Sequence, residues 1–253
     1  MRILCTNDDG IHAPGLKVME AIARALSDDV WIVAPETDQS GVAHSLSLND
    51  PLRLREVGGQ HYAVKGTPTD CVIMGVRHLM RDHRPDLILS GVNRGQNVAE
   101  DVSYSGTVAG AIEGTILGIP SIALSQAYGP TRRHDLKWQC AEHHGPKVIR
   151  RILDVGIDKG ILINVNFPGC EPEEVEGIAL CNQGQRTQEL LRLDEREDGR
   201  GIPYYWIAFE RKPFTPGNGT DLWAIANRRI AVTPLRLDMT DEPSLTRYAQ
   251  AFE

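Results

Sequence analysis

Short apolar runs with no polar alternation recur along the first two thirds of the chain. Ile3–Cys5 and Val30–Ala34 are too short for helices and are typical of strands buried on both faces of a sheet. Between them, apolar residues from Leu16 to Leu26 return at the spacing of one helix face. A strand, a helix and a second strand in this order predict parallel strands joined by a right-handed crossover.

The alternation of strands and helices continues as far as Phe167. Asp86–Ser90, Ile119–Leu124 and Ile161–Phe167 are further predicted strands, and Trp138–Val155 is a predicted helix that ends at a glycine. Alternating elements of this kind indicate a layered α/β fold with a mainly parallel sheet.

Two local signals add detail to this framework. A pair of glycines separates Leu52–Val57 from His61–Val64, which predicts a hairpin. Thr67, Pro68 and Asp70 are the residue types of an N-cap, a first helical position and a capping box. We therefore expect a helix to begin there.

The pattern changes in the last quarter of the chain. Asp194–Gly201 is charged, and Tyr204–Arg211 is aromatic and strand-like, so together they predict a hairpin that projects from the core. An exposed aromatic ribbon needs a surface to cover it. We therefore expect the hairpin to take part in a dimer contact.

A last strand at Arg229–Pro234 and an amphipathic helix at Ser244–Phe252 complete the chain. We divide the protein accordingly into a catalytic core, residues 1–181, and a C-terminal extension, residues 182–253, that serves oligomerisation.

Composition changes this picture little, but it limits the choice of partners. The chain has 253 residues, of which 41% are hydrophobic and 24% charged, as in soluble globular proteins. Its net charge of −7 argues against a surface that binds a nucleic acid polymer. A small phosphorylated substrate is compatible with this charge, because a metal ion and a few arginines can make one site positive.

Cysteine content and hydropathy indicate the compartment. The five cysteines are widely spaced and form no CxxC pair, so neither a disulfide framework nor a thiolate zinc site is indicated. The N-terminus has too few apolar residues for a signal peptide, and no run approaches the ~18 apolar residues of a membrane span. We expect a cytoplasmic protein without membrane contact.

Asp8 and Asp9 place two carboxylates in the turn that follows the first predicted strand. Two unit charges about 4 Å apart repel by ~4 kcal/mol at an effective dielectric constant near 20. A divalent cation reverses the sign of this interaction, and hard cations take oxygen ligands. The same Asn-Asp-Asp-Gly sequence also suits an Asx-type turn without a metal, and these four residues alone do not decide between the two.

Further oxygen donors follow neighbouring strands. Ser40 comes after the second predicted strand, and Asn93 comes after the strand that ends at Ser90. Because ligands bind beyond the carboxyl ends of parallel strands, we expect these side chains to gather with Asp8 and Asp9. Two carboxylates, a hydroxyl and an amide oxygen suit Mg²⁺, Mn²⁺ or Ca²⁺ better than a closed zinc site.

A phosphate site is predicted at the start of a helix rich in small residues. Ser105, Gly106 and Thr107 begin this helix, and the backbone N–H groups of a helix start bind anions. The amide of Asn97, in the preceding polar loop, is a further candidate for holding the phosphate. Plainer interpretations stay open, because a serine N-cap and a turn-stabilising asparagine need no ligand.

Short segments in a fixed order carry a more specific signal than any one site. They are NDDGIHAPG (7–15), QSG (39–41), GTPTDC (66–71), SGVNRGQN (90–97), YSGT (104–107), INVN (163–166), GTD (219–221) and TPL (233–235). Together they resemble the SurE family of stationary-phase survival proteins, metal-dependent phosphatases that act on nucleoside monophosphates. The resemblance spans nearly the whole chain.

This resemblance implies a fold, a site and an activity. The core would be a Rossmann-like three-layer sandwich, and the C-terminal hairpin and helix would be exchanged between subunits to build a homodimer, often paired into a homotetramer. Asp8, Asp9, Ser40 and Asn93 would be the ligands of one divalent cation per subunit, Mg²⁺ or Mn²⁺, with Ca²⁺ able to occupy the site in a crystal. The activity would be hydrolysis of nucleoside 5′- and 3′-monophosphates to nucleoside and phosphate, and of short-chain polyphosphate.

The predicted mechanism is phosphomonoester hydrolysis with one divalent ion. Asp8 and Asp9 orient the ion, Asp9 accepts the proton of a water molecule, and Asn97 with the helix start at Ser105–Thr107 holds the phosphate. Two other classes of protein predict different behaviour. A nucleotide-binding module would bind AMP without releasing phosphate, and a cofactor-dependent Rossmann enzyme would need the dinucleotide-binding glycines that this sequence lacks.

Overall fold

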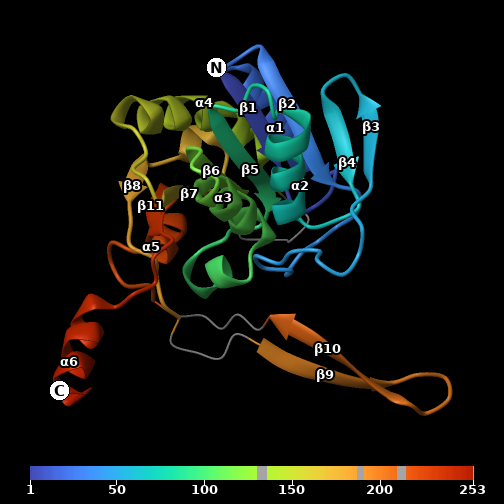
Figure 1. The fold of residues 1–253 in the computed structure, drawn as a ribbon. Coiled ribbons are helices and arrows are strands. Elements are labelled where there is room, and N and C mark those ends of the chain that lie inside the picture. The colour runs from blue at the N-terminus through green and yellow to red at the C-terminus, as the bar shows by residue number, and fades with distance from the viewer. Residues whose placement is uncertain (130–135, 187–190, 210–214, 253) are drawn as a thin grey trace.

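A nine-stranded sheet forms the centre of the computed structural model, which describes residues 1–129, 136–186, 191–209 and 215–252 (Figure 1). Helices cover both faces of this sheet. From one edge to the other, the strands are β3 (Leu54–Gly58), β4 (His61–Val64), β2 (Asp29–Pro35), β1 (Arg2–Thr6), β5 (Leu87–Arg94), β6 (Ser121–Gln126), β7 (Ile161–Phe167), β11 (Ile230–Arg236) and β8 (Ile178–Leu180).

In the sheet order from β4 to β7, each strand runs parallel to the next. β3 is antiparallel at one edge, and β11 is antiparallel to β7 near the other. Side chains of β1 alternate between the two faces: Ile3 and Cys5 enter one buried core, and Leu4 enters another. Burial on both faces explains why the strands are apolar without alternation, and the mainly parallel α/β sandwich predicted from the sequence is confirmed.

The α-helices of the described residues are α1 (Pro14–Arg24), α2 (Pro68–Met74), α3 (Gly106–Ile116), α4 (Trp138–Val155), α5 (Asp221–Ala226) and α6 (Glu242–Phe252). α1 and α4 pack on one face of the sheet, while α2 and α3 lie together on the other. Gly145 allows α4 to approach α1 closely, because a Cβ atom there would lie 2.8 Å from Ile22.

Several elements have the bounds that the sequence indicated. α4 and β7 begin and end at the predicted residues, and β3 and β4 form the predicted hairpin. At the start of α2, Thr67 Oγ1 accepts from the Asp70 N–H at 3.2 Å, and Asp70 Oδ2 accepts from the Thr67 N–H at 2.8 Å. β5 continues to Arg94, beyond its prediction, and the short elements β8 and α5 were not predicted because so few residues show little periodicity.

The predicted C-terminal hairpin is formed by β9 (Leu191–Glu197) and β10 (Pro203–Phe209), which project from the body of the protein (Figure 1). The end of its second predicted strand, residues 210 and 211, lies outside the described residues. Leu193 and Ile207 face each other across the hairpin with about 70% of each side chain exposed. α6 projects as well and has no buried residue.

The structure also bears on the cysteines and on the hydropathy of the described residues. All five cysteines are buried, and none forms a disulfide. No helix in this part of the chain has the length and apolar character needed to cross a membrane.

Candidate functional site

Most of the predicted site residues gather around a cavity of about 240 Å³ beyond the carboxyl ends of β1 and β5 and beside the start of α3. This is the edge at which open parallel sheets bind ligands. The predicted residues that line the cavity are Asp8, Ser40, Asn93, Asn97 and Ser105. The other lining residues are Gly41, Arg94, Gly95, Gln96, Asp101, Tyr104 and Tyr128.

Asp8 lies in the turn after β1 and has only 4% of its surface exposed. Burial, with smaller contributions from the negative charges of Asp9 and Asp38, raises the pKa of its carboxyl group from 3.8 to about 7. The Thr107 hydroxyl opposes this shift by donating a 2.5 Å hydrogen bond to Asp8 Oδ1. Ionisation of Asp8 is therefore less favourable in the folded protein than in water, and a positive charge nearby would favour it.

Asp9 lies on the other side of the same turn. Its Oδ2 atom accepts a 3.1 Å hydrogen bond from the backbone N–H of Arg94, and its Oδ1 atom is 3.9 Å from the Arg94 guanidinium. Burial raises the pKa of Asp9, and both interactions with Arg94 lower it. Asp9 lines a neighbouring pocket with Asp38 and Trp138. It binds Arg94, the residue that follows Asn93 in the sequence.

Ser40 reaches the cavity from the loop after β2, and Asn93 reaches it from the end of β5. The Ser40 N–H donates to Asp38 Oδ1 at 2.8 Å, and the preceding N–H, of Gln39, donates to the Asp8 carbonyl at 2.8 Å. Asn93 Nδ2 donates to the Gly95 carbonyl at 2.9 Å. This contact is the turn-stabilising role considered from the sequence, and it leaves the amide oxygen of Asn93 for another partner.

The start of α3 has a side-chain cap and two open donors. Ser105 Oγ accepts from the Val108 N–H at 3.0 Å, and the Ser105 carbonyl accepts from the Ala109 N–H. Among the described residues, no acceptor contacts the N–H groups of Gly106 and Thr107 in the first turn. Gly106 also permits close contact, because a Cβ atom there would lie 2.7 Å from Asp8.

Asn97 is fixed on the wall of the cavity by its backbone and its side chain. Its N–H donates to Asn166 Oδ1 at 2.7 Å, and its carbonyl accepts from the side-chain amides of Asn164 and Asn166. One side-chain N–H of Asn97 donates to Ser125 Oγ at 2.9 Å, so the other remains for a ligand.

Sequence reasoning missed Arg94, Asp101 and the contact of Thr107 with Asp8. Arg94 is the cation that lines the cavity and also contacts Asp9. Its place directly after Asn93 is the signal that could have identified it. The role of Thr107 had no such signal, since 99 residues separate it from Asp8.

The donor chemistry at this edge fits a hard divalent cation. No group of three or more His, Cys, Asp or Glu side chains is placed to hold a metal ion in the described part of the chain. The candidate set instead combines the carboxylates of Asp8 and Asp9 with the amide oxygen of Asn93 and the hydroxyl of Ser40. All four donors are oxygen atoms, as Mg²⁺ and Mn²⁺ prefer, and a cation would stabilise the ionised form of Asp8.

Comparison with known proteins extends over the whole chain. A family model described as "Survival protein SurE" matches residues 3–190. The chain is 72% identical to the "5′-nucleotidase SurE" of Methylorubrum extorquens (strain PA1), covering 100% of this chain and 99% of that one, and 74% identical to the protein of the same name from Methylobacterium sp. (strain 4-46), with 99% of each covered. The crystal structure of the SurE protein from Aquifex aeolicus superposes with a TM-score of 0.87 at 38% identity, and the match covers 100% of both chains.

Proposed function

The chain belongs to the SurE family, and we propose that it is a 5′-nucleotidase that hydrolyses nucleoside monophosphates with the help of one divalent cation. Relatives that are 72% and 74% identical over nearly their whole length carry the name 5′-nucleotidase. The observation that supports metal-dependent chemistry is the buried carboxylate of Asp8 next to the open N-terminus of α3, beside one cavity.

Four side chains would hold the cation: the carboxylates of Asp8 and Asp9, the amide oxygen of Asn93 and the hydroxyl of Ser40. When bound, Mg²⁺ or Mn²⁺ supplies charge neutralisation at the phosphoryl oxygens and a water molecule of lowered pKa. Of the two carboxylates, that of Asp9 is the less buried and so the more accessible to a water molecule. We therefore assign to Asp9 the proton of the attacking water.

The phosphoryl group would be held by donors that lie next to these ligands. The first-turn N–H groups of Gly106 and Thr107 lie at the positive end of the α3 dipole. The second side-chain N–H of Asn97 and the guanidinium of Arg94 add a polar and a charged donor. Such donors stabilise negative charge as it develops on the phosphoryl oxygens.

The proposal extends to nucleoside 3′-monophosphates and short-chain polyphosphate. The contacts assigned above are all to the cation or the phosphoryl group, and none is to the base. A phosphate with a different leaving group can therefore use the same residues.

We further propose a homodimer in the cytoplasm, with a homotetramer as a pair of dimers, and no nucleic acid polymer or membrane as partner. The apolar side chains of Leu193 and Ile207 are exposed on a two-stranded hairpin, which is marginally stable without a covering surface. The five buried cysteines without disulfides agree with a reducing compartment.

Phosphate release from AMP, GMP and phenyl phosphate, with and without Mn²⁺, tests the proposed activity. We expect release that requires Mn²⁺ and is abolished by EDTA. A nucleotide-binding module would instead bind AMP saturably and release no phosphate, and turnover undiminished by EDTA would rule out the metal-dependent mechanism.

Replacement of Asp9 tests the metal site itself. Asp9→Asn removes the charge of one proposed ligand, so we expect loss of both Mn²⁺ binding and phosphatase activity with an unchanged circular dichroism spectrum. Glu36→Gln removes an exposed carboxylate from the same polar edge and serves as the control. Wild-type turnover in Asp9→Asn would contradict the proposed role.

A further inference from the structure

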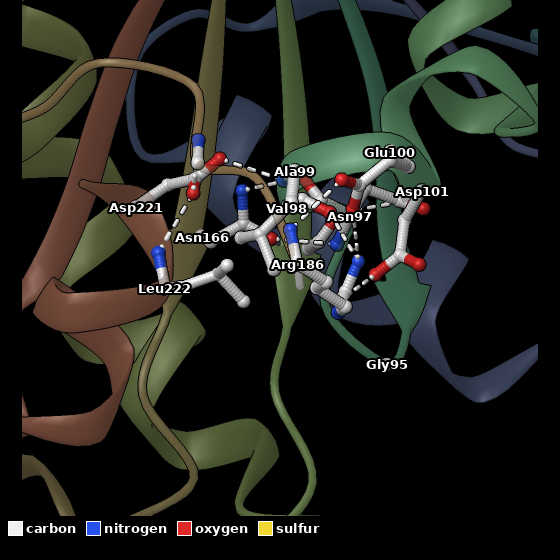
Figure 2. Close-up of polar contacts among 12 residues, drawn as sticks. Gly95, Asn97, Val98, Ala99, Glu100, Asp101, Asn166, Arg186, Asp221 and Leu222 are labelled. Atoms are coloured by element: carbon white, nitrogen blue, oxygen red, sulfur yellow. Dashed lines mark hydrogen bonds and ion pairs between the residues drawn. The ribbon is translucent and has the colours of Figure 1, made fainter. Parts of the chain in front are cut away.

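We propose that Arg186 and Asp221 position the segment Asn97–Asp101, called here the wall segment, which forms one side of the candidate cavity (Figure 2). The inference rests on the proposed function, because it concerns how this segment holds the phosphoryl group. Asn97 and Asp101, at the two ends of the wall segment, line the cavity, whereas the described lining includes neither Arg186 nor Asp221. Both are therefore positioning residues and not catalytic ones.

The middle of the wall segment has a backbone conformation that needs support from outside. Ala99 has a φ angle of 53°, in the left-handed region that residues with a side chain rarely adopt. Its N–H donates to Asp221 Oδ2 at 2.9 Å, and its carbonyl accepts from Gln183 Nε2 at 2.8 Å. Strained backbone of this kind persists where its surroundings hold it, and it is often found at functional sites.

Arg186 binds three other residues of the wall segment, Val98, Glu100 and Asp101. Its Nη2 atom donates to Asp101 Oδ2 at 2.8 Å, and its Nη1 atom donates to Glu100 Oε2 at 3.1 Å and to the Val98 carbonyl at 3.3 Å. Only 3% of its side chain is exposed. The planar fork of the guanidinium thus joins three residues of the wall segment at once, which a lysine ammonium cannot do with the same geometry.

Asp221 connects the wall segment to two other parts of the chain. It is fully buried at the first position of α5, and besides the Ala99 N–H it accepts from the N–H groups of Gly184 and Leu222 at 2.8 and 2.7 Å. An asparagine there would turn its NH₂ group toward one of these donors, because an amide has only one accepting oxygen.

These contacts act on the cavity through Asn97. Asn164 and Asn166 of β7 bind the backbone of Asn97. Two residues further along the chain, Asp221 holds Ala99 (Figure 2). Loss of the support behind Ala99 or Asp101 would let the wall segment shift. A displacement of about 1 Å in a substrate-positioning group can cost roughly a hundredfold in rate.

Steady-state kinetics of Arg186→Lys and Asp221→Asn test this proposal. With AMP and saturating Mn²⁺, we expect KM and the inhibition constant of inorganic phosphate to rise by about tenfold or more, since both report on phosphoryl binding. The affinity for Mn²⁺ should stay within about twofold of wild type, because Asp8, Asp9 and Ser40 lie outside the wall segment. The Ala99 amide should exchange its hydrogen faster in Asp221→Asn.

Two controls separate positioning from general loss of stability. Val148→Ala truncates a buried side chain of α4, which packs on the face of the sheet opposite to α3. We expect this variant to have a lower Tm, with KM and phosphate inhibition at the wild-type values. In Arg186→Ala, added guanidinium ion should restore phosphate inhibition, whereas methylammonium should not.

The outcomes distinguish this proposal from the proposed function. Failure of the wild-type protein to release phosphate from AMP with Mn²⁺ would overturn the function. An active wild type whose Arg186→Lys and Asp221→Asn variants keep wild-type KM and phosphate inhibition would overturn the positioning role alone. A change in those constants equal to that of Val148→Ala at the same loss of Tm would also overturn it.

Discussion

Asp8 is the residue at which burial and charge oppose each other most directly. Its carboxyl group is enclosed by the turn after β1 and the first turn of α3, and Thr107 supplies only one neutral donor. With a pKa of about 7, Asp8 of the cation-free folded protein keeps a proton between about pH 4 and pH 7 that the unfolded chain has released. Ionisation of Asp8 therefore lowers the stability of the folded protein, and a bound cation would offset this cost.

The pH dependence of stability follows from this shift. Between pH 4 and pH 7 the folded state binds more protons at Asp8 than the unfolded state does, so the stability of the cation-free protein falls as pH rises, by up to about 4 kcal/mol. Asp8→Asn removes the titrating group and keeps an acceptor for Thr107. In EDTA we expect this variant to have a higher Tm than wild type at pH 8, with a smaller difference at pH 5.

Asp82→Asn, at an aspartate with 91% of its side chain exposed, is the matched control and should leave Tm unchanged at both pH values. Adding Mn²⁺ at pH 8 should raise the Tm of wild type and not that of Asp8→Asn. Equal cation-free Tm values at pH 8, or a difference that grows toward low pH, would show that the charge of Asp8 is not the destabilising feature.

At the scale of elements, α2 and α3 lie on the same face of the sheet and both begin with a side-chain cap, but of these two caps only that of α3 lies at the cavity. Thr67 caps α2, and Ser105 caps α3 and lines the cavity. The two serve the same local purpose, since each hydroxyl accepts a backbone N–H that the helix leaves unpaired. Any functional role of Ser105 must therefore be measured against Thr67.

Paired substitutions make this comparison. Thr67→Ala and Ser105→Ala should each lower the free energy of unfolding by about 1 kcal/mol, the usual cost of losing a cap. Only Ser105→Ala should also raise KM for AMP, because its helix start is the one proposed to hold the phosphoryl group. Chemical denaturation and steady-state kinetics on the same samples measure both effects. Equal KM values in the two variants would show that Ser105 serves only as a helix cap.

At the scale of the whole molecule, the C-terminal extension has two surfaces that the described residues leave exposed. The hairpin of β9 and β10 forms a sheet of its own, and α6 buries none of its residues (Figure 1). β11, in contrast, returns to the central sheet between β7 and β8. The extension is thus tied to the core through β11, α5 and the contacts of Arg186, whereas its hairpin and α6 are exposed.

Oligomeric state tests whether a second copy covers these surfaces. Leu193→Glu together with Ile207→Glu places two like charges directly opposite each other on the exposed face of the hairpin. We expect sedimentation velocity to show dimers or tetramers for wild type and a smaller species for the double variant. Leu180→Glu, at an exposed residue of β8, is the control and should assemble as wild type does. A wild type that sediments as a monomer would contradict the homodimer.

The sequence by itself determined the parts of the fold that depend on neighbours along the chain. The capping box of Thr67 and Asp70 and the bounds of α4 and β7 follow from rules that act within a few residues. Even the gathering of Asp8, Ser40 and Asn93 at one cavity was predictable, because the carboxyl ends of parallel strands share one edge of a sheet.

Only the tertiary structure decided what lies behind those side chains. The contacts that hold them join residues 85 to 122 positions apart in the sequence. They are the hydrogen bond of Thr107 to Asp8 and the bonds of Arg186 and Asp221 to the wall segment. No periodicity or turn rule links residues at such separations, because their distance is set by the packing of the whole sheet and by the return of the chain through β11. The same packing buries Asp8 and so gives two adjacent aspartates different surroundings, which their sequence alone did not distinguish.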